Sequence, residues 1–201
     1  MTRNTLLPSL LAGAAILLTT AVTSHAGQPT KQLKSTTDAL LEVLENPELA
    51  GEQNREQRRT KLRSILRDRF ALRQMGRLTV QTEAWNQAGD EQHERFFELF
   101  EALLERTYLA EIEGYEGQTI KFQGESIQGR TATVTTLIRR RKTEDLPITY
   151  RVLNRGDDWV VYDVIISGVS VVRNYRDQFA EILNGGTFAD LIAKLKEKGL
   201  E

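Results

Sequence analysis

The hydrophobic period of this chain changes at Gly114, and this change limits the fold more than any other feature of the sequence. Before Gly114, apolar residues recur every three or four positions, which is typical of amphipathic helices. This spacing predicts helices over 31–45, 52–69 and 70–81, and a longest helix from Gly89 to about Tyr108. After Gly114, apolar and polar residues alternate, which predicts strands over 118–127, 130–140, 147–155 and 159–166.

The segments between the predicted strands are short, so consecutive strands should be antiparallel neighbours. Two more helices are expected to close the chain, over 169–183 and 188–198, and Asp90 is the expected N-cap of the longest helix. We therefore predict a single α+β domain. In this domain, N-terminal helices pack on a curved four-stranded antiparallel sheet, and C-terminal helices follow the sheet.

The first 26 residues have the features of a secretory signal peptide. Arg3 precedes an apolar run from Leu10 to Val22, and the segment ends in Ser24-His25-Ala26. The run is shorter than the about 20 residues that span a bilayer. We expect cleavage after Ala26 and a soluble exported domain over 27–201, with an uncleaved anchor as the alternative. Cleavage removes one basic residue, so 26 Lys and Arg remain against 28 Asp and Glu.

The residue inventory excludes several kinds of chemistry. The chain has no cysteine, which rules out thiol nucleophiles, thiolate metal sites and disulfides. His93 is the one histidine left after cleavage, and we interpret it as a solvated helix residue. The sequence has no GxSxG motif and no GxxxxGK[ST] phosphate loop. The near-neutral charge argues against a general nucleic-acid binder.

The segment WVVYDVIISGVSVVRNYRDQFAEIL combines a hydrophobic strand, a glycine turn and an amphipathic helix. It resembles the signature of the MlaC family, and the matching positions are Trp159, Val161, Tyr162, Asp163, Val164, Gly168, Val169, Ser170, Asn174, Tyr175, Arg176 and Phe179. The segment from Phe70 to Tyr108 also resembles the family, but this match is less specific. One departure is Ser167, where an acidic or amide residue is expected. The turn itself should depend on Gly168.

The resemblance implies a function as well as a fold. MlaC-like proteins are periplasmic phospholipid carriers that shuttle lipid between an outer-membrane lipoprotein-porin complex and an inner-membrane ABC transporter with an MCE-domain ring, and so maintain outer-membrane lipid asymmetry. They bind lipid and do not catalyse. The resemblance therefore implies a monomeric MlaC-like phospholipid-binding domain over 27–201, a cone-shaped, NTF2-like scaffold and no metal or organic cofactor.

A phospholipid carrier needs an apolar cavity between its sheet and its helices. At roughly 0.8 kcal/mol per buried CH₂, about thirty methylenes in two acyl chains represent on the order of 24 kcal/mol that must stay out of water. The sequence offers large apolar residues for such a cavity, which we call the predicted apolar site: Phe96, Phe100, Leu104, Tyr108, Phe122, Tyr150, Val152, Val164, Ile166, Val169, Tyr175 and Phe179. Each residue taken singly is better explained as part of an ordinary core, and the whole set together with the family resemblance favours a cavity.

Other readings remain open at the level of sequence. Two groups of basic residues could meet a phosphate, steer the protein toward an acidic partner, or simply solvate the surface. These groups are Arg67, Arg69, Arg73 and Arg77, and the run Arg139-Arg140-Arg141-Lys142. A second function class is an exported hydrolase or isomerase that uses Asp163 or a tyrosine of the pocket. A salt bridge or hydrogen bond between Asp163 and a nearby arginine explains this carboxylate more simply. A third class is an adaptor whose apolar residues form only a core.

Overall fold

The computed structural model describes residues 27–140 and 143–200. The signal peptide predicted for 1–26 lies outside these residues, as do Arg141 and Lys142 of the predicted basic run. The helices before the sheet are α1 (Gln28–Glu45), α2 (Arg55–Arg69), α3 (Leu72–Leu78), α4 (Thr82–Gln87) and α5 (Asp90–Glu113). The strands are β1 (Thr119–Gln128), β2 (Thr131–Arg139), β3 (Leu146–Arg155), β4 (Asp158–Ile166) and β5 (Val169–Ser170), and the last helices are α6 (Val171–Leu183) and α7 (Phe188–Leu200).

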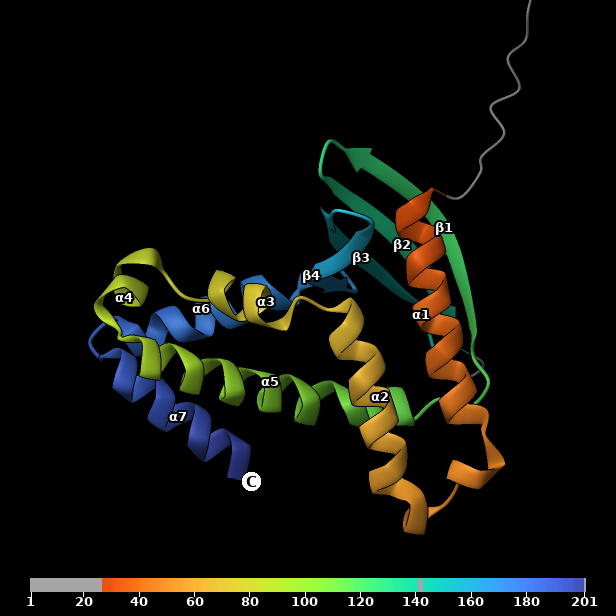
Figure 1. Ribbon diagram of the computed structural model, residues 1–201, viewed down its shortest axis with the longest axis horizontal. Coiled ribbons are helices and arrows are strands. Elements are labelled where there is room, and N and C mark those ends of the chain that lie inside the picture. The colour runs from red at the N-terminus through yellow and green to blue at the C-terminus, as the bar shows by residue number, and fades with distance from the viewer. Residues whose placement is uncertain (1–26, 141–142, 201) are drawn as a thin grey trace, which may run out of the picture.

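The sheet is an antiparallel meander in the order β1-β2-β3-β4-β5, so the predicted α+β fold is confirmed. The short connections between the strands leave each strand beside its predecessor. Two irregularities interrupt the register, one between Phe122 and Gly124 and one between Arg151 and Val152. Such bulges increase the local twist and bend the sheet. Figure 1 shows the bent sheet beside α1.

The domain has two hydrophobic clusters, and the sheet contributes to both. The sheet cluster joins Leu33 of α1 to the face of the sheet that carries Val134, Val152 and Val161. We call this side of the sheet the inner face. The helical cluster lies among α3, α5, α6 and α7, with Phe96, Phe100, Phe179 and Leu191 at its centre. In Figure 1, α5, α6 and α7 form the helical half of the molecule, and α1 lies along the sheet.

Two local predictions were wrong, and one short helix was not predicted. The N-cap of α5 is Gly89, and its N–H donates to Gln92 Oε1 at 3.1 Å, so Asp90 is the first helical residue. A carboxylate at this position still interacts favourably with the positive N-terminal end of the helix dipole. Helix α4 was not predicted, because it is only 6 residues long. The helix after the sheet starts two residues later than predicted, because Val169 and Ser170 form a fifth strand.

The turn between β4 and β5 explains why an acidic or amide residue is expected at position 167. Both turn residues have positive φ, 48° at Ser167 and 84° at Gly168, and Ile166 pairs with Val169 across the turn. This is the geometry of a two-residue hairpin loop, which favours Asn or Asp followed by Gly. Ser167 occupies a conformation that L-residues other than Asn and Asp adopt at a cost.

Ser167→Asn should therefore stabilise the protein by about 0.5–1 kcal/mol, because asparagine tolerates the left-handed conformation. Urea denaturation followed by circular dichroism measures this change. Ser126→Asn is the control, because Ser126 is an exposed β1 residue that does not have positive φ. Equal effects of the two substitutions would contradict a conformational cause.

Candidate functional site

The predicted apolar site divides between the two hydrophobic clusters. Five of its six helical members are at most 7% exposed: Phe96, Phe100, Leu104, Tyr175 and Phe179. Their rings pack against each other, with centroids 5.8 Å apart for Phe96 and Phe100 and 5.7 Å apart for Phe100 and Tyr175. These side chains fill the space among the helices, so the structure places them in a close-packed helical core.

The sixth helical member, Tyr108, borders the helical cluster, and the remaining members lie on the strands of the sheet. Val152 is fully buried in the sheet cluster, and Phe122 and Tyr150 pack against it while only partly buried. Val164 packs against both clusters, whereas Ile166 and Tyr108 border the helical one. Val169 differs from the prediction because its side chain is exposed, with 59% of its surface accessible. Its strand pairs only with β4 and forms the edge of the sheet.

The strand register shows which inner-face side chains are neighbours. Ile120, Ile138 and Leu146 form one row across β1, β2 and β3. Phe122, Thr136, Ile148 and Ile166 form the next row, from β1 to β4. The apolar side chains of both rows are only half-buried. Two rows further along, Ala132, Val152 and Val161 are buried beneath α1.

We call the half-buried apolar side chains of these first two rows the open apolar rows; they are Ile120, Ile138, Leu146, Phe122, Ile148 and Ile166. Only Phe122 and Ile166 among these six residues belong to the predicted apolar site. The other four could have been found from strand parity, because Ile148 is two residues from Tyr150 on the same strand, and residues two apart share a face.

Two tyrosines of the predicted apolar site are desolvated. Burial, followed by the neighbouring Tyr175, raises the pKa of the Tyr108 hydroxyl to about 12. Burial also raises the pKa of Tyr150, against a smaller opposing effect of a hydrogen bond with Thr136. Tyr150 nevertheless keeps part of its surface accessible. Both hydroxyls stay protonated at neutral pH, so neither can act there as a base or an anion.

Asp163 is a structural carboxylate. It is 3% exposed, and its Oδ2 accepts from Arg151 Nη1 at 3.2 Å and from Ser170 Oγ at 2.7 Å. Its Oδ1 accepts from the backbone N–H of Val172 at 3.1 Å, which ties β4 to the start of α6. The predicted ion pair with an arginine is therefore confirmed. Both carboxylate oxygens therefore accept hydrogen bonds within the protein.

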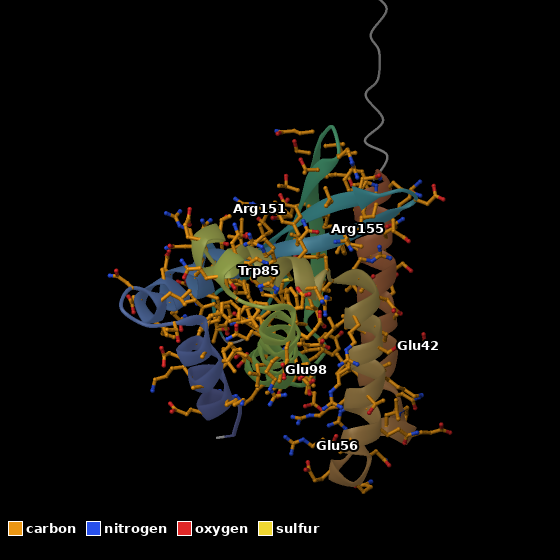
Figure 2. The ribbon with its side chains drawn as sticks, turned by 60° about the vertical axis from the view of Figure 1, so that its left-hand side comes forward. Glu42, Glu56, Trp85, Glu98, Arg151 and Arg155 are labelled. Atoms are coloured by element: carbon orange, nitrogen blue, oxygen red, sulfur yellow. The ribbon has the colours of Figure 1, made fainter. Side chains whose placement is uncertain are left out.

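An ionic seam joins α2 to α5, which are crossing helices in Figure 1. Arg58 and Arg59 bind Glu113 at 2.9 and 2.8 Å, each through a different carboxylate oxygen. Further along the seam, Arg63 binds Glu105 at 2.6 Å, and Arg67 binds Glu101. In Figure 2, Glu56 of α2 and Glu98 of α5 lie in the lower half of the view, away from Arg151 and Arg155 at the sheet.

Glu113 gives the seam a pH-dependent contribution to stability. Burial favours the neutral acid, but the hydrogen bonds and charges of Arg59 and Arg58 together outweigh it and lower the pKa of Glu113 below its ordinary value of 4.5. A carboxyl with a lowered folded-state pKa stabilises the protein above its unfolded pKa. This stabilisation is lost as the pH falls through the folded-state pKa.

Glu113→Gln should lower the free energy of unfolding by about 1–3 kcal/mol at pH 7. The difference from the wild type should shrink as the pH falls below 4.5, the ordinary pKa. Urea denaturation between pH 3 and pH 7 measures it. Glu52→Gln is the matched control, since Glu52 pairs with Arg55 in an exposed position and should matter little. A difference that stays constant with pH would contradict this role.

Most of the basic residues singled out in the sequence form hydrogen bonds or ion pairs with other residues of the protein. Arg69 donates to Thr36, Gln32 and the Trp159 carbonyl, and so links α2 to α1 and β4. Arg73 pairs with Glu94, Arg77 donates to the Val80 carbonyl, and Arg139 pairs with Asp145 at 3.0 Å. Each of these arginines is therefore paired within the protein, and Arg67, which pairs with Glu101, also lines a hollow in the seam.

His93 was wrongly interpreted as a solvated residue. Its ring stacks on Trp85 with centroids 3.9 Å apart, and its Nε2 lies 3.0 Å from the Trp85 carbonyl oxygen. It therefore fastens α4 to α5.

Two hollows open on the surface, and both are lined largely by polar residues. One lies between α2 and α5, and the other lies beside Asp163 at the start of α6. Neither is lined by a residue of the predicted apolar site, so the apolar cavity stays a prediction. Within 27–140 and 143–200, no group of three or more acidic or histidine side chains is placed to hold a metal ion. Among the same residues, no helix is both long and apolar enough to cross a bilayer.

These features define a class of protein: a single α+β domain whose bent sheet turns a partly open apolar face toward its helices. A model of the MlaC protein family matches residues 34–197. The chain therefore belongs to the MlaC family.

Two characterised relatives and one solved structure resemble the chain. The intermembrane phospholipid transport system binding protein MlaC of Haemophilus influenzae is 28% identical, over 53% of this chain and 52% of its own. The toluene tolerance protein ttg2D of Pseudomonas putida is 30% identical, over 48% of this chain and 45% of its own. The chain thus matches about half the length of these relatives.

The structural match extends further than these sequence matches. A phospholipid-binding protein of Ralstonia solanacearum, solved with a phospholipid, superposes with a TM-score of 0.76 and 23% identity, over 87% of this chain and 98% of that one. At this identity the match concerns the fold.

Proposed function

We propose that this protein is a periplasmic phospholipid carrier whose acyl-chain site is built on the open apolar rows. The observation that carries this proposal is the uneven burial of one continuous sheet face. One end of the inner face is closed by α1, with Val134, Val152 and Val161 at 0% exposure. The other end consists of large apolar side chains that stay half-buried. Acyl chains covering this end would remove its remaining apolar surface from water.

The relatives support a lipid as the ligand. Two of them are named for phospholipid binding or phospholipid transport, and one was solved with a phospholipid bound. Within the predicted apolar site, the half-buried residues Phe122, Tyr150, Val164 and Ile166 are the strongest candidates for lipid contact. The ring cluster around Phe100 would support this site from the helical side.

The proposal includes a route for the lipid. The signal sequence predicted for 1–26 would export the chain, and signal peptidase would release the domain 27–201. As a monomer, this domain would shuttle phospholipid between an outer-membrane lipoprotein-porin complex and an inner-membrane MCE-domain ABC transporter, maintaining outer-membrane lipid asymmetry. No catalysis and no cofactor are required, because the transporter would supply the energy.

Native mass spectrometry of the protein purified from the periplasm without detergent tests this proposal. The expected mass is that of residues 27–201 plus one phospholipid, and solvent extraction should release that lipid for identification. A bare protein that also takes up no phospholipid from vesicles would overturn the carrier function. A mass that still includes residues 1–26 would overturn the cleavage.

A further inference from the structure

Helix α1 begins beside a carboxylate of the neighbouring strand β1. Its N-cap is Gly27, which has no side chain to cap the helix. Glu125 of β1 does so instead, because its Oε2 accepts from the backbone N–H of Thr30 at 2.7 Å. A carboxylate at this end of a helix also interacts favourably with the helix dipole. In Figure 1, α1 lies along β1, and Glu125 joins the first turn of the helix to the sheet.

The Glu125 carboxylate also lies directly against Gly27. A Cβ added at Gly27 would overlap Glu125 Oε1 and lie 3.2 Å from Oε2. Both residues are half-buried, so water screens this carboxylate only in part. Within 27–140 and 143–200, no lysine, arginine or histidine pairs with Glu125, and its Oε1 accepts no hydrogen bond. The structure therefore places a half-buried carboxylate beside residue 27 without a cation to balance it.

The same turn of α1 contains a second unpaired polar atom. Thr30 is 8% exposed, and its Oγ1 is buried without a hydrogen-bond partner among the described residues. Such a group is costly to bury unless a partner is supplied. Thr30 is the third residue after the N-cap, the position whose side chain bonds the N-cap nitrogen in a capping box. The nitrogen of Gly27 thus belongs to a turn in which two oxygens lack a partner.

We propose that Gly27 is the first residue of the mature protein and that its α-ammonium group forms an ion pair with Glu125. The inference rests on the proposed cleavage after Ala26 and adds what this cleavage does to the fold. Signal peptidase adds water across the Ala26–Gly27 peptide bond, so Ala26 leaves with a carboxylate and Gly27 keeps an amine. The amine takes up the proton that the new carboxyl group releases, since an α-amino group is protonated at neutral pH.

Cleavage changes what residue 27 can offer to its neighbours. In the precursor, the nitrogen of Gly27 is an uncharged amide with a single N–H. In the mature protein it is an ammonium group with three N–H donors, which supplies a cation to Glu125 Oε1 and a donor to Thr30 Oγ1. An ammonium group alone would be repelled by the positive end of the helix dipole, and the carboxylate offsets this repulsion. Processing therefore fixes the start of α1, the helix whose Leu33 covers the closed end of the inner face.

Selective acetylation of the α-amine tests the ion pair. Slightly below neutral pH the α-amine reacts before the lysines, because its ordinary pKa is about 8 and theirs is about 10. Protein is purified from the periplasm, and mass spectrometry verifies that it begins at Gly27 and carries one acetyl group. Acetylation should lower the melting temperature of the wild type by about 2–4 °C. In Glu125→Gln protein it should not lower the melting temperature, because an unpaired N-terminal charge opposes the helix dipole.

Two further variants complete the test. Glu116→Gln is the matched control, because Glu116 is an exposed glutamate just before β1. Acetylation should lower its melting temperature as much as that of the wild type. Gly27→Ala disturbs the pair from the other side, since its Cβ would displace the Glu125 carboxylate. Acetylation should then have less effect than in the wild type, and this result does not require Glu125→Gln to fold.

The outcomes separate this inference from the carrier function. An equal loss of melting temperature on acetylation in wild-type and Glu125→Gln protein would overturn the ion pair, as would no loss in the wild type. A first residue other than Gly27 would overturn both the ion pair and the predicted cleavage. None of these results changes the bound lipid seen in native mass spectra. Protein that shows the ion pair but takes up no phospholipid would overturn the carrier function alone.

Discussion

Phe100→Ala is expected to lower the free energy of unfolding of lipid-free protein by about 3–5 kcal/mol, the usual cost of removing a fully buried phenylalanine side chain. Phe100 is 1% exposed, and its ring packs against Phe96, Tyr175 and Phe179. Gly76 of α3 also approaches it so closely that an added Cβ would lie 3.0 Å from the Phe100 ring. Neighbours held by three helices cannot collapse into the vacated space, so a cavity should remain.

Urea denaturation of the delipidated protein measures this loss of stability. The dependence of the free energy of unfolding on urea concentration is compared between the variants. Phe97→Ala is the matched control, since Phe97 is the neighbouring phenylalanine on the same helix but is only partly buried, beneath the Arg73 guanidinium. Phe97→Ala should lower the free energy of unfolding clearly less than Phe100→Ala does. If both variants lower the free energy of unfolding equally, the rings around Phe100 are not the centre of the helical core.

Ile148→Glu should reduce phospholipid retention at least about 100-fold, because it places a carboxylate among the open apolar rows. Ile148 lies between Thr136 and Ile166 on the inner face of the sheet. Acyl chains in contact with this row would have to desolvate the new charge. Retention is measured as the fraction of protein that carries phospholipid in native mass spectra and as the rate of lipid transfer between vesicles.

Ile165→Glu is the control for this prediction. Ile165 is also a half-buried β-strand isoleucine, but it pairs with Thr149 and therefore lies on the opposite face of the sheet. It should leave lipid retention near the wild-type level. If both substitutions abolish retention in folded protein, or if neither does, the acyl chains are not on the inner face at Ile148. Thermal melting of both variants separates a lost site from a lost fold.

Much of the architecture followed from local physics and was predictable from the sequence. Alternation after Gly114 predicted the four long strands, and the short turns required them to be antiparallel neighbours. Gly168 predicted the turn after β4, and its φ of 84° confirms why a glycine is needed there. These features depend on residues close in the chain, so a single sequence contains the information.

The candidate site was less predictable because residue type does not specify which cluster a side chain joins. Phe96 and Phe122 look alike in the sequence, yet Phe96 is in the closed helical core and Phe122 is among the open apolar rows. Val169 matched the family signature, yet the edge position of β5 leaves it exposed. These differences arise from the distances between elements, which the local period does not contain.

The sequence by itself determined the types and order of the secondary-structure elements, the absence of thiol chemistry and the resemblance to MlaC proteins. Tertiary structure alone decided the pairing of Arg63 and Arg67 with glutamates about forty residues away, and the division of the apolar residues into two clusters. The physical reason is that these interactions act over different distances along the chain. Hydrophobic period and turn chemistry act between neighbours in the chain, whereas burial and ion pairing depend on how distant segments pack together.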